Sequence, residues 1–259
     1  VAGLSRRNAR AKHRRFLVEG PQGVREAVRH APGRVLDVYL TEAVLERHSE
    51  IWDEAVAAGL YVHVTTQQVM DAMSPDAQGL LAVVATEEAT GSEALAAALE
   101  GARLVAVLTQ AQDPGNAGTI IRAADAAGAD AVVLVRGSVD PTAPKVVRST
   151  AGSLFHLPVV TGVALDDAVT ALHNAGLTVL AADGRGDFDL FEAESLLEAP
   201  SAWLLGNEAH GLPSEALSRA DAVVSIPIYG KAESLNVAAA AAVCLYASAR
   251  AQAQNSGRS

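Results

Sequence analysis

Cysteine is almost absent from this chain of 259 residues, since Cys244 is the only one. A single thiol can form no intrachain disulfide and cannot supply a zinc site built from four cysteines. Long apolar runs are missing too: the longest, around 237–246, is shorter than the roughly 20 helical residues that cross a bilayer. The arginine-rich start lacks the apolar stretch of a secretory signal. We therefore expect a soluble, cytoplasmic protein with no metal site.

Two common nucleotide-binding motifs are also absent. The dinucleotide fingerprint G-x-G-x-x-G does not occur, because the third glycine position after Gly184 and Gly186 is Asp189. No phosphate loop ending in G-K-[ST] is present. These absences argue against an NAD-dependent dehydrogenase and against a nucleoside triphosphatase.

Positive charge is scarce overall, and it is concentrated at the start. The formal net charge is −10, yet residues 1–34 carry nine basic side chains against two acidic ones, a net +7 that leaves −17 on the remainder. An acidic body repels a polyanion, whereas a basic segment attracts one. The start of the chain is therefore either a segment that binds a polyanion or a solvated basic tail.

Hydrophobic residues make up 50% of the chain, which excludes general disorder and suits one large or two modest domains. Alanine-rich segments of helical spacing alternate with short branched-aliphatic runs, a pattern typical of α/β architecture with a mostly parallel sheet. The polar segment 86–93 is expected to act as a linker. We predict a small α/β domain over 1–88, a linker and first helix over 89–102, and a second α/β domain over 103–254.

The elements expected in each part follow from these patterns. In the first domain they are helices at 20–30, 42–58 and 66–73, the last capped by Thr65 or Thr66, and strands at 35–40, 61–64 and 80–85. In the second they are strands at 104–108, 131–135, 177–181, 202–205 and 222–226, and helices at 117–127, 166–174 and 235–250.

Three loops that follow predicted strands are unusual, and ligands of open parallel sheets bind at the carboxyl ends of strands. In the first loop, Asn116 can cap a helix or bind a substrate, and Arg122 lies about two turns further along. The second loop, 205–213, places Glu208 between two glycines. The third, 226–237, opens a long alanine-rich helix that Ser234 or Asn236 can cap. Taken singly, each loop also fits an ordinary capped helix or turn.

Taken together, the three loops resemble the motifs of the SpoU family, also called the TrmH family, of RNA ribose 2′-O-methyltransferases in the SPOUT superfamily. The motifs look like N-x-G-x-x-x-R, here Asn116, Gly118 and Arg122; G-x-E-x-x-G, here Gly206, Glu208 and Gly211; and I-P followed by S-L-N-V, here Ile226, Pro227 and 234–237. The resemblance covers about 104–250. Residues 15–20 and the helix after them look like the start of the substrate-binding domain that is often fused ahead of the catalytic one.

The resemblance implies a SPOUT α/β fold with a mostly parallel sheet and a C-terminal deep trefoil knot, preceded by a smaller α/β domain. It also implies S-adenosylmethionine as cofactor, RNA as partner, and a homodimer with no membrane or metal partner. The residues implied to be catalytic are Arg122, Asn116, Glu208, Ser234 and Asn236, and those implied to bind the cofactor are Gly206, Asn207, Ile226, Ser234 and Leu235.

The role of Arg122 has two versions. The family mechanism implies that this side chain activates the ribose hydroxyl, but a free guanidinium keeps its proton at neutral pH. Arg122 is then either a base in an unusual environment beside a phosphate, or a group that orients the ribose and stabilises the developing alkoxide. In both versions Glu208 is expected to orient Arg122.

RNA contacts are expected mainly from the basic start, and the side chains predicted to make them are Arg6, Arg7, Arg10, Lys12, Arg14, Arg15, Lys145 and Arg148. The additional N-terminal domain favours 23S ribosomal RNA as the substrate. A transfer RNA 2′-O-methyltransferase of the same family and a catalytically inactive RNA-binding or ribosome-assembly module are the alternatives.

Overall fold

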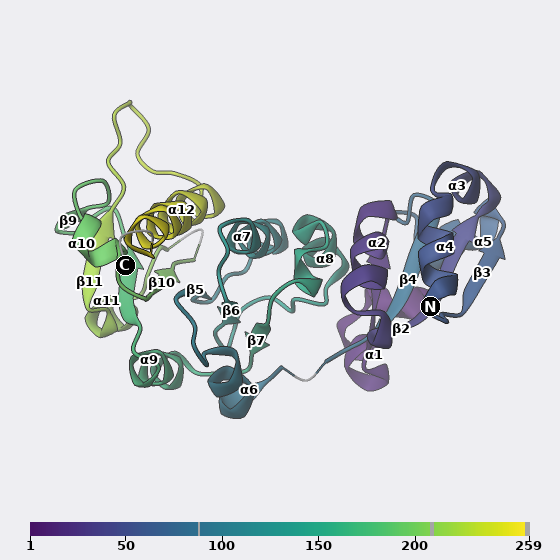
Figure 1. The fold of residues 1–259 in the computed structure, drawn as a ribbon, viewed down its shortest axis with the longest axis horizontal. Helices are drawn as coiled ribbons and strands as arrows, with labels where there is room; N and C mark the ends of the chain where they lie inside the picture. The colour runs from purple at the N-terminus through teal and green to yellow at the C-terminus, as the bar shows by residue number, and fades with distance from the viewer. Residues whose placement is uncertain (88, 208–209, 257–259) are drawn as a thin grey trace. The chain divides into compact units, whose positions relative to one another are not determined.

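The structure is a computed structural model that describes residues 1–87, 89–207 and 210–256 (Figure 1). The chain forms two compact units: unit 1 consists of Val1–Glu88 and Asp140–His156, and unit 2 of Ala89–Val139 and Leu157–Ser259. In the described part of the chain, no helix combines the length and the apolar character that crossing a membrane requires.

Unit 1 is built on a four-stranded sheet with the strand order β1-β4-β2-β3. The strands are β1 (Arg15–Glu19), β2 (Val35–Thr41), β3 (Val62–Thr65) and β4 (Leu80–Ala85). Strand β4 runs antiparallel to β1 and β2, whereas β2 and β3 are parallel. The helices are η1 (Ala2–Ser5), α1 (Arg7–His13), α2 (Pro21–His30), η2 (Pro32–Arg34), α3 (Glu42–Arg47), α4 (Ser49–Ala57), α5 (Gln67–Met73), α8 (Pro144–Thr150) and η3 (Ser153–Phe155).

Unit 1 differs from the prediction at one strand and one helix in particular, and η1, α1 and η2 were not predicted either. Strand β1 was not predicted, because Phe16 and Val18 pack into one buried cluster and Leu17 into another, so the run lacks the alternation of a half-exposed strand. The single helix predicted over 42–58 is wrong: His48, with φ −135° and ψ 45°, ends α3 before α4 begins. The predicted cap at Thr66 is confirmed, since its hydroxyl accepts from the Val69 amide at 3.3 Å.

Residues 140–156 belong to unit 1 through both apolar and charged contacts. Val147 and Phe155 lie in the same buried cluster as Phe16. Arg10 is only 5% exposed, and its Nη2 lies 2.6 Å from Oδ2 of Asp140. Arg148 forms ion pairs with Glu19 and Asp76. This second segment therefore completes the core of unit 1, although the strands that flank it in sequence belong to unit 2.

Unit 2 contains a seven-stranded sheet with the order β7-β6-β5-β10-β8-β11-β9, in which every pairing is parallel. The strands are β5 (Leu104–Leu108), β6 (Ala131–Leu134), β7 (Val159–Thr161), β8 (Thr178–Ala182), β9 (Phe188–Asp189), β10 (Ser201–Leu205) and β11 (Ala222–Ser225). The helices are α6 (Gly91–Ala98), α7 (Pro114–Ala126), α9 (Leu165–Asn174), α10 (Glu194–Leu197), α11 (Ser214–Arg219) and α12 (Val237–Ser256).

The prediction of an α/β protein with a mostly parallel sheet and a smaller α/β unit ahead of it is confirmed. The short strands β7 and β9 were not predicted. The knot stays a prediction. Because all seven strands of unit 2 are parallel, the loops after β5, β8, β10 and β11 leave the sheet at the same edge.

Candidate active site

A cavity of about 350 Å³ lies at the carboxyl edge of the unit 2 sheet. Its walls come from the segments after β8, β10 and β11 and from the start of α12. All five residues predicted to bind the cofactor line it: Gly206, Asn207, Ile226, Ser234 and Leu235. The fold thus brings together side chains and backbone groups that are separated by some thirty positions in the sequence, in a volume typical of small-molecule sites.

The loop after β10 folds tightly on itself. The amide of Asn207 donates to the carbonyl of Gly211, and the amide of Gly211 donates back, each at 2.9 Å. A Cβ on Gly206 would lie 2.4 Å from the carbonyl carbon of Gly211 and 2.6 Å from the amide nitrogen of Leu212. Only glycine fits at position 206, so the backbone itself forms this cavity wall. Glu208, predicted to be catalytic, lies outside the described residues.

The first and third motifs meet through two asparagines. Nδ2 of Asn236 donates to Oδ1 of Asn116 at 3.1 Å, and Oδ1 of Asn236 accepts from the amides of Ala238 and Ala239 at the start of α12. Asn236, not Ser234, is therefore the side-chain cap of α12. Asn116 does not cap α7, because the carboxylate of Asp113 does so by accepting from the Asn116 amide at 2.8 Å.

The second motif is joined to the loop ahead of α7. Nδ2 of Asn207 donates to the backbone carbonyl of Gln110 at 2.9 Å, and Gln110 lies between β5 and α7. Hydrogen bonds thus link the second and third motifs to the segment that carries the first. Arg122, also on α7, is exposed. Among the described residues no hydrogen-bond or ion-pair partner holds its guanidinium, which leaves this group available for a ligand.

Asp183 is a further cavity residue that sequence reasoning missed. Its carboxylate accepts from Nε of Arg185 at 2.9 Å and from Nη2 at 3.1 Å. These side-chain bonds to Arg185 lower the pKa of Asp183 and outweigh the opposing effect of its partial burial. The carboxylate is consequently ionised at neutral pH. The available signal was its position immediately after a strand end, in a loop that did not match any motif.

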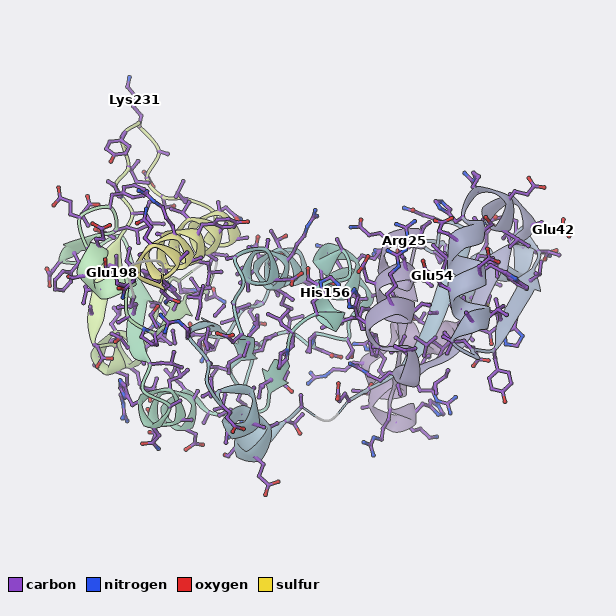
Figure 2. The ribbon with its side chains drawn as sticks, viewed as in Figure 1. Arg25, Glu42, Glu54, His156, Glu198 and Lys231 are labelled. Atoms are coloured by element: carbon purple, nitrogen blue, oxygen red, sulfur yellow. The ribbon has the colours of Figure 1, made fainter. Side chains whose placement is uncertain are left out.

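The loop between β11 and α12 projects from unit 2, with Lys231 at its tip (Figure 2). Tyr229 in this loop is 87% exposed, while Ile228 and Leu235 are about two-fifths exposed, at 39% and 41%. Ile226, Ser234 and Leu235 at the two ends of the loop line the cavity. Ile228 also lines the cavity, whereas Tyr229 does not.

The basic residues predicted to contact RNA divide into two groups. Arg6, Arg7, Lys12, Arg14 and Arg15 are exposed on or beside α1. Arg10 is buried, and its guanidinium donates hydrogen bonds to Asp140, Thr142 and the backbone carbonyls of Leu4 and Ser5. Lys145 is exposed, and Arg148 is ion-paired with Glu19 and Asp76. Arg10 thus has a structural contact that the count of basic residues could not reveal.

The two functions of Asn236 can be separated by substitution. Asn236→Ala removes the cap of α12 and should lower the free energy of unfolding by about 1 kcal/mol. Asn236→Asp keeps a capping oxygen and should retain most of that stability, although it removes the donor to Asn116. Urea denaturation of the two variants checks this. Equal stability losses in both would show that the cap contributes nothing.

Comparison with known families covers most of the chain. Residues 103–246 match the model of the SpoU rRNA Methylase family. Residues 17–90 match the model described as RNA 2′-O ribose methyltransferase substrate binding. The two matches fall in the order and in the regions in which the sequence motifs were found.

Individual relatives agree with these matches. The 23S rRNA (guanosine(2553)-2′-O)-methyltransferase RlmP of Bacillus subtilis is 34% identical over 94% of this chain and 92% of its own length. The 23S rRNA (uridine(2479)-2′-O)-methyltransferase of Streptomyces viridochromogenes is also 34% identical, over 95% of this chain and 86% of its own length. The solved structure of the SpoU methyltransferase AviRb from Streptomyces viridochromogenes, in complex with the cofactor AdoMet, is similar with a TM-score of 0.81 and 31% identity, covering 97% of this chain and 96% of that one.

Proposed function

The chain belongs to the SpoU rRNA methylase family, and on that premise we propose that it transfers a methyl group from S-adenosylmethionine to a ribose 2′-hydroxyl of 23S ribosomal RNA. The observation that carries the proposal is the cavity at the carboxyl edge of unit 2, lined by all five residues expected at the cofactor. The match of 17–90 to a substrate-binding domain for RNA 2′-O ribose methylation supports the substrate class.

Several residues that line the cavity suit S-adenosylmethionine. Gly206 provides a backbone wall that a Cβ would obstruct, which suits close contact of amides and carbonyls with a ligand. Apolar atoms of Ile226 and Leu235 and the ionised carboxylate of Asp183 line the same space. A carboxylate complements the positive charge that this cofactor carries. When bound, the cofactor supplies an electrophilic methyl group on a sulfonium.

The protein's own contribution is to position the ribose hydroxyl in line with that methyl group. We assign this task to Arg122, whose guanidinium can donate to the ribose and the adjoining phosphate and stabilise the oxygen while the hydroxyl proton passes to solvent water. Asn116 and Asn236, bonded to each other, hold α7 and the start of α12 together beside the cavity. This assignment favours the orienting version of the Arg122 role over the base version.

The exposed basic residues of unit 1 are proposed to hold RNA phosphates. Arg7→Ala should weaken RNA binding and lower the slope of log affinity against log salt by about 1, with unchanged stability. Arg10→Ala should instead cost about 3 kcal/mol of folding free energy, because it leaves Asp140 without its buried partner. Filter binding at several salt concentrations and urea denaturation separate the two effects. Identical behaviour of the two variants would refute this division.

A tritiated-methyl assay tests the proposed function directly. The protein is incubated with labelled S-adenosylmethionine and unmodified 23S rRNA, 16S rRNA or transfer RNA, and the product is mapped for 2′-O-methyl nucleotides. Label in one ribose of 23S rRNA supports the proposal. Label in transfer RNA alone would favour the transfer RNA enzyme, and absence of label on every RNA despite measurable RNA binding would favour an inactive assembly factor.

We also propose that the active form is a homodimer and that it works in the cytoplasm. Tyr229 of the projecting loop is 87% exposed in the single chain, and burial against a second copy would remove its ring from water. Light scattering of the purified protein measures the mass of the assembly, and a mass of one chain would contradict the dimer.

A further inference from the structure

Two histidines and one glutamate converge on the surface of unit 1. Oε2 of Glu26 lies 3.0 Å from Nε2 of His156 and 3.2 Å from Nε2 of His30. The three potential ligand atoms lie within 4.8 Å of one another. We propose that Glu26, His30 and His156 form a binding site for Zn²⁺ that joins helix α2 to the segment after α8. His156 is labelled in Figure 2.

Two of the three ligand-atom separations are close to what tetrahedral zinc requires, and all three are within 4.8 Å. With metal–ligand bonds of about 2.1 Å at tetrahedral angles, two ligand atoms are separated by roughly 3.4 Å. Both glutamate–histidine distances are within a few tenths of an ångström of that value. Two neutral imidazoles and a carboxylate are a common ligand set for zinc, and the fourth position is then open to water.

Other histidines with carboxylate neighbours lack this arrangement. His63 pairs with Asp37 and His173 with Asp221, each as a single pair. In the described part of the chain, the set Glu26, His30 and His156 is the one group of at least three such side chains whose ligand atoms converge. The thiol of Cys244 offers no competing ligand at the surface, because this residue is fully buried.

The surroundings of Glu26 favour the site. Gly152, at φ +101°, leaves room for the glutamate side chain, since a Cβ there would lie 2.4 Å from Cγ of Glu26. The nearby cation Arg29 is engaged by both oxygens of Glu54, at 2.6 and 2.7 Å, which offsets its repulsion of a metal ion. The carboxylate is 20% exposed and the His156 ring 27% exposed, so an ion can reach them from solvent.

A metal at this position would cross-link helix α2 to the segment 140–156 within unit 1. Glu26 and His30 are four residues apart on α2, whereas His156 is 130 positions from Glu26 and immediately follows η3. Zinc bound by all three stabilises the docking of 140–156 on α2, because the unfolded chain offers no such preformed site. The site is independent of the proposed methyl transfer.

Calorimetric titration of the full chain with ZnCl₂, free of any histidine tag, tests the proposal. We expect one ion per chain and a higher thermal unfolding midpoint with zinc present. His156→Ala and Glu26→Gln should each weaken zinc binding at least about 10-fold. Loss of a residue that only supports a metal ligand already weakens metal binding by about this factor, so loss of a ligand itself should cost no less. His63→Ala, which removes a histidine paired with one carboxylate in the same unit, should leave the affinity unchanged.

Circular dichroism checks that each variant is folded. If His156→Ala or Glu26→Gln does not fold, His30→Ala is used in its place. Substitution of Co²⁺ gives a second readout, since a tetrahedral site with histidine ligands produces visible absorption bands. Zinc affinity that is equal in the native chain and in His156→Ala, or binding weaker than millimolar in the native chain, would overturn the proposal and leave the cluster as a hydrogen-bonded trio.

Discussion

Replacing Arg122 by alanine is expected to lower the rate of methyl transfer by about 10³-fold, the size of effect seen when a donor to a developing oxyanion is removed. The Kd for S-adenosylmethionine should stay nearly unchanged, because Arg122 is not among the residues that line the cofactor cavity. The side chain is exposed on α7, so its truncation should not disturb the core. Single-turnover transfer of labelled methyl to RNA and calorimetry with the cofactor measure the two quantities.

Arg219→Ala is the matched control, since Arg219 is an exposed arginine of unit 2 that pairs with Asp166 at 2.9 Å, and neither lines the cavity. It should transfer methyl groups at the native rate. Arg122→Lys distinguishes charge from geometry: lysine keeps the charge but lacks the planar fork, so a large remaining defect points to orientation of the ribose. Near-native turnover of Arg122→Ala would remove this residue from the mechanism.

Gly206→Val is expected to weaken S-adenosylmethionine binding at least 100-fold, roughly the factor that about 3 kcal/mol of steric misfit produces. The reason is the 2.4 Å and 2.6 Å approaches that a Cβ at position 206 would make to Gly211 and Leu212. Those contacts are with backbone atoms, which cannot rotate away as a side chain does. The loop after β10 must shift, and the cavity wall shifts with it.

Gly184→Ala is the control for this prediction. Gly184 lines the same cavity, but a Cβ there meets nothing within 4 Å. Cofactor affinity should therefore fall far less than for Gly206→Val. Thermal unfolding of both variants checks that each remains folded at the assay temperature. Cofactor affinity of a folded Gly206→Val variant equal to that of Gly184→Ala would contradict the role of the tight loop.

The target nucleotide is a property that overall similarity does not determine. Two relatives that are each 34% identical to this chain are named for different bases, a guanosine and a uridine of 23S rRNA. Transfer to a 2′-hydroxyl involves a ribose that all nucleotides share, so the choice of nucleotide depends on contacts outside the reacting atoms. Mapping the methylated position is consequently more informative here than a finer sequence comparison.

The resemblance to the family motifs pointed to residues that the fold brings to one cavity. Gly206, Ile226 and Leu235 were each identified from the sequence, and all three line one cavity. The order of the strands could not be predicted from the sequence. Strand β10 lies between β5 and β8 in the sheet, although β5 is distant from it in the chain. Asp183 was likewise missed, since its place in the cavity depends on the pairing of β8 beside β10.

The sequence by itself determined the α/β class, the family and the residues of the three motifs, because periodicity and local spacing are properties of short segments. Only the tertiary structure decided that Arg10 is a buried ion-pair partner of Asp140, that 140–156 completes unit 1, and that His156 meets Glu26. Each of these pairs residues about 130 positions apart. Such contacts arise from packing of the whole chain, which no local pattern encodes.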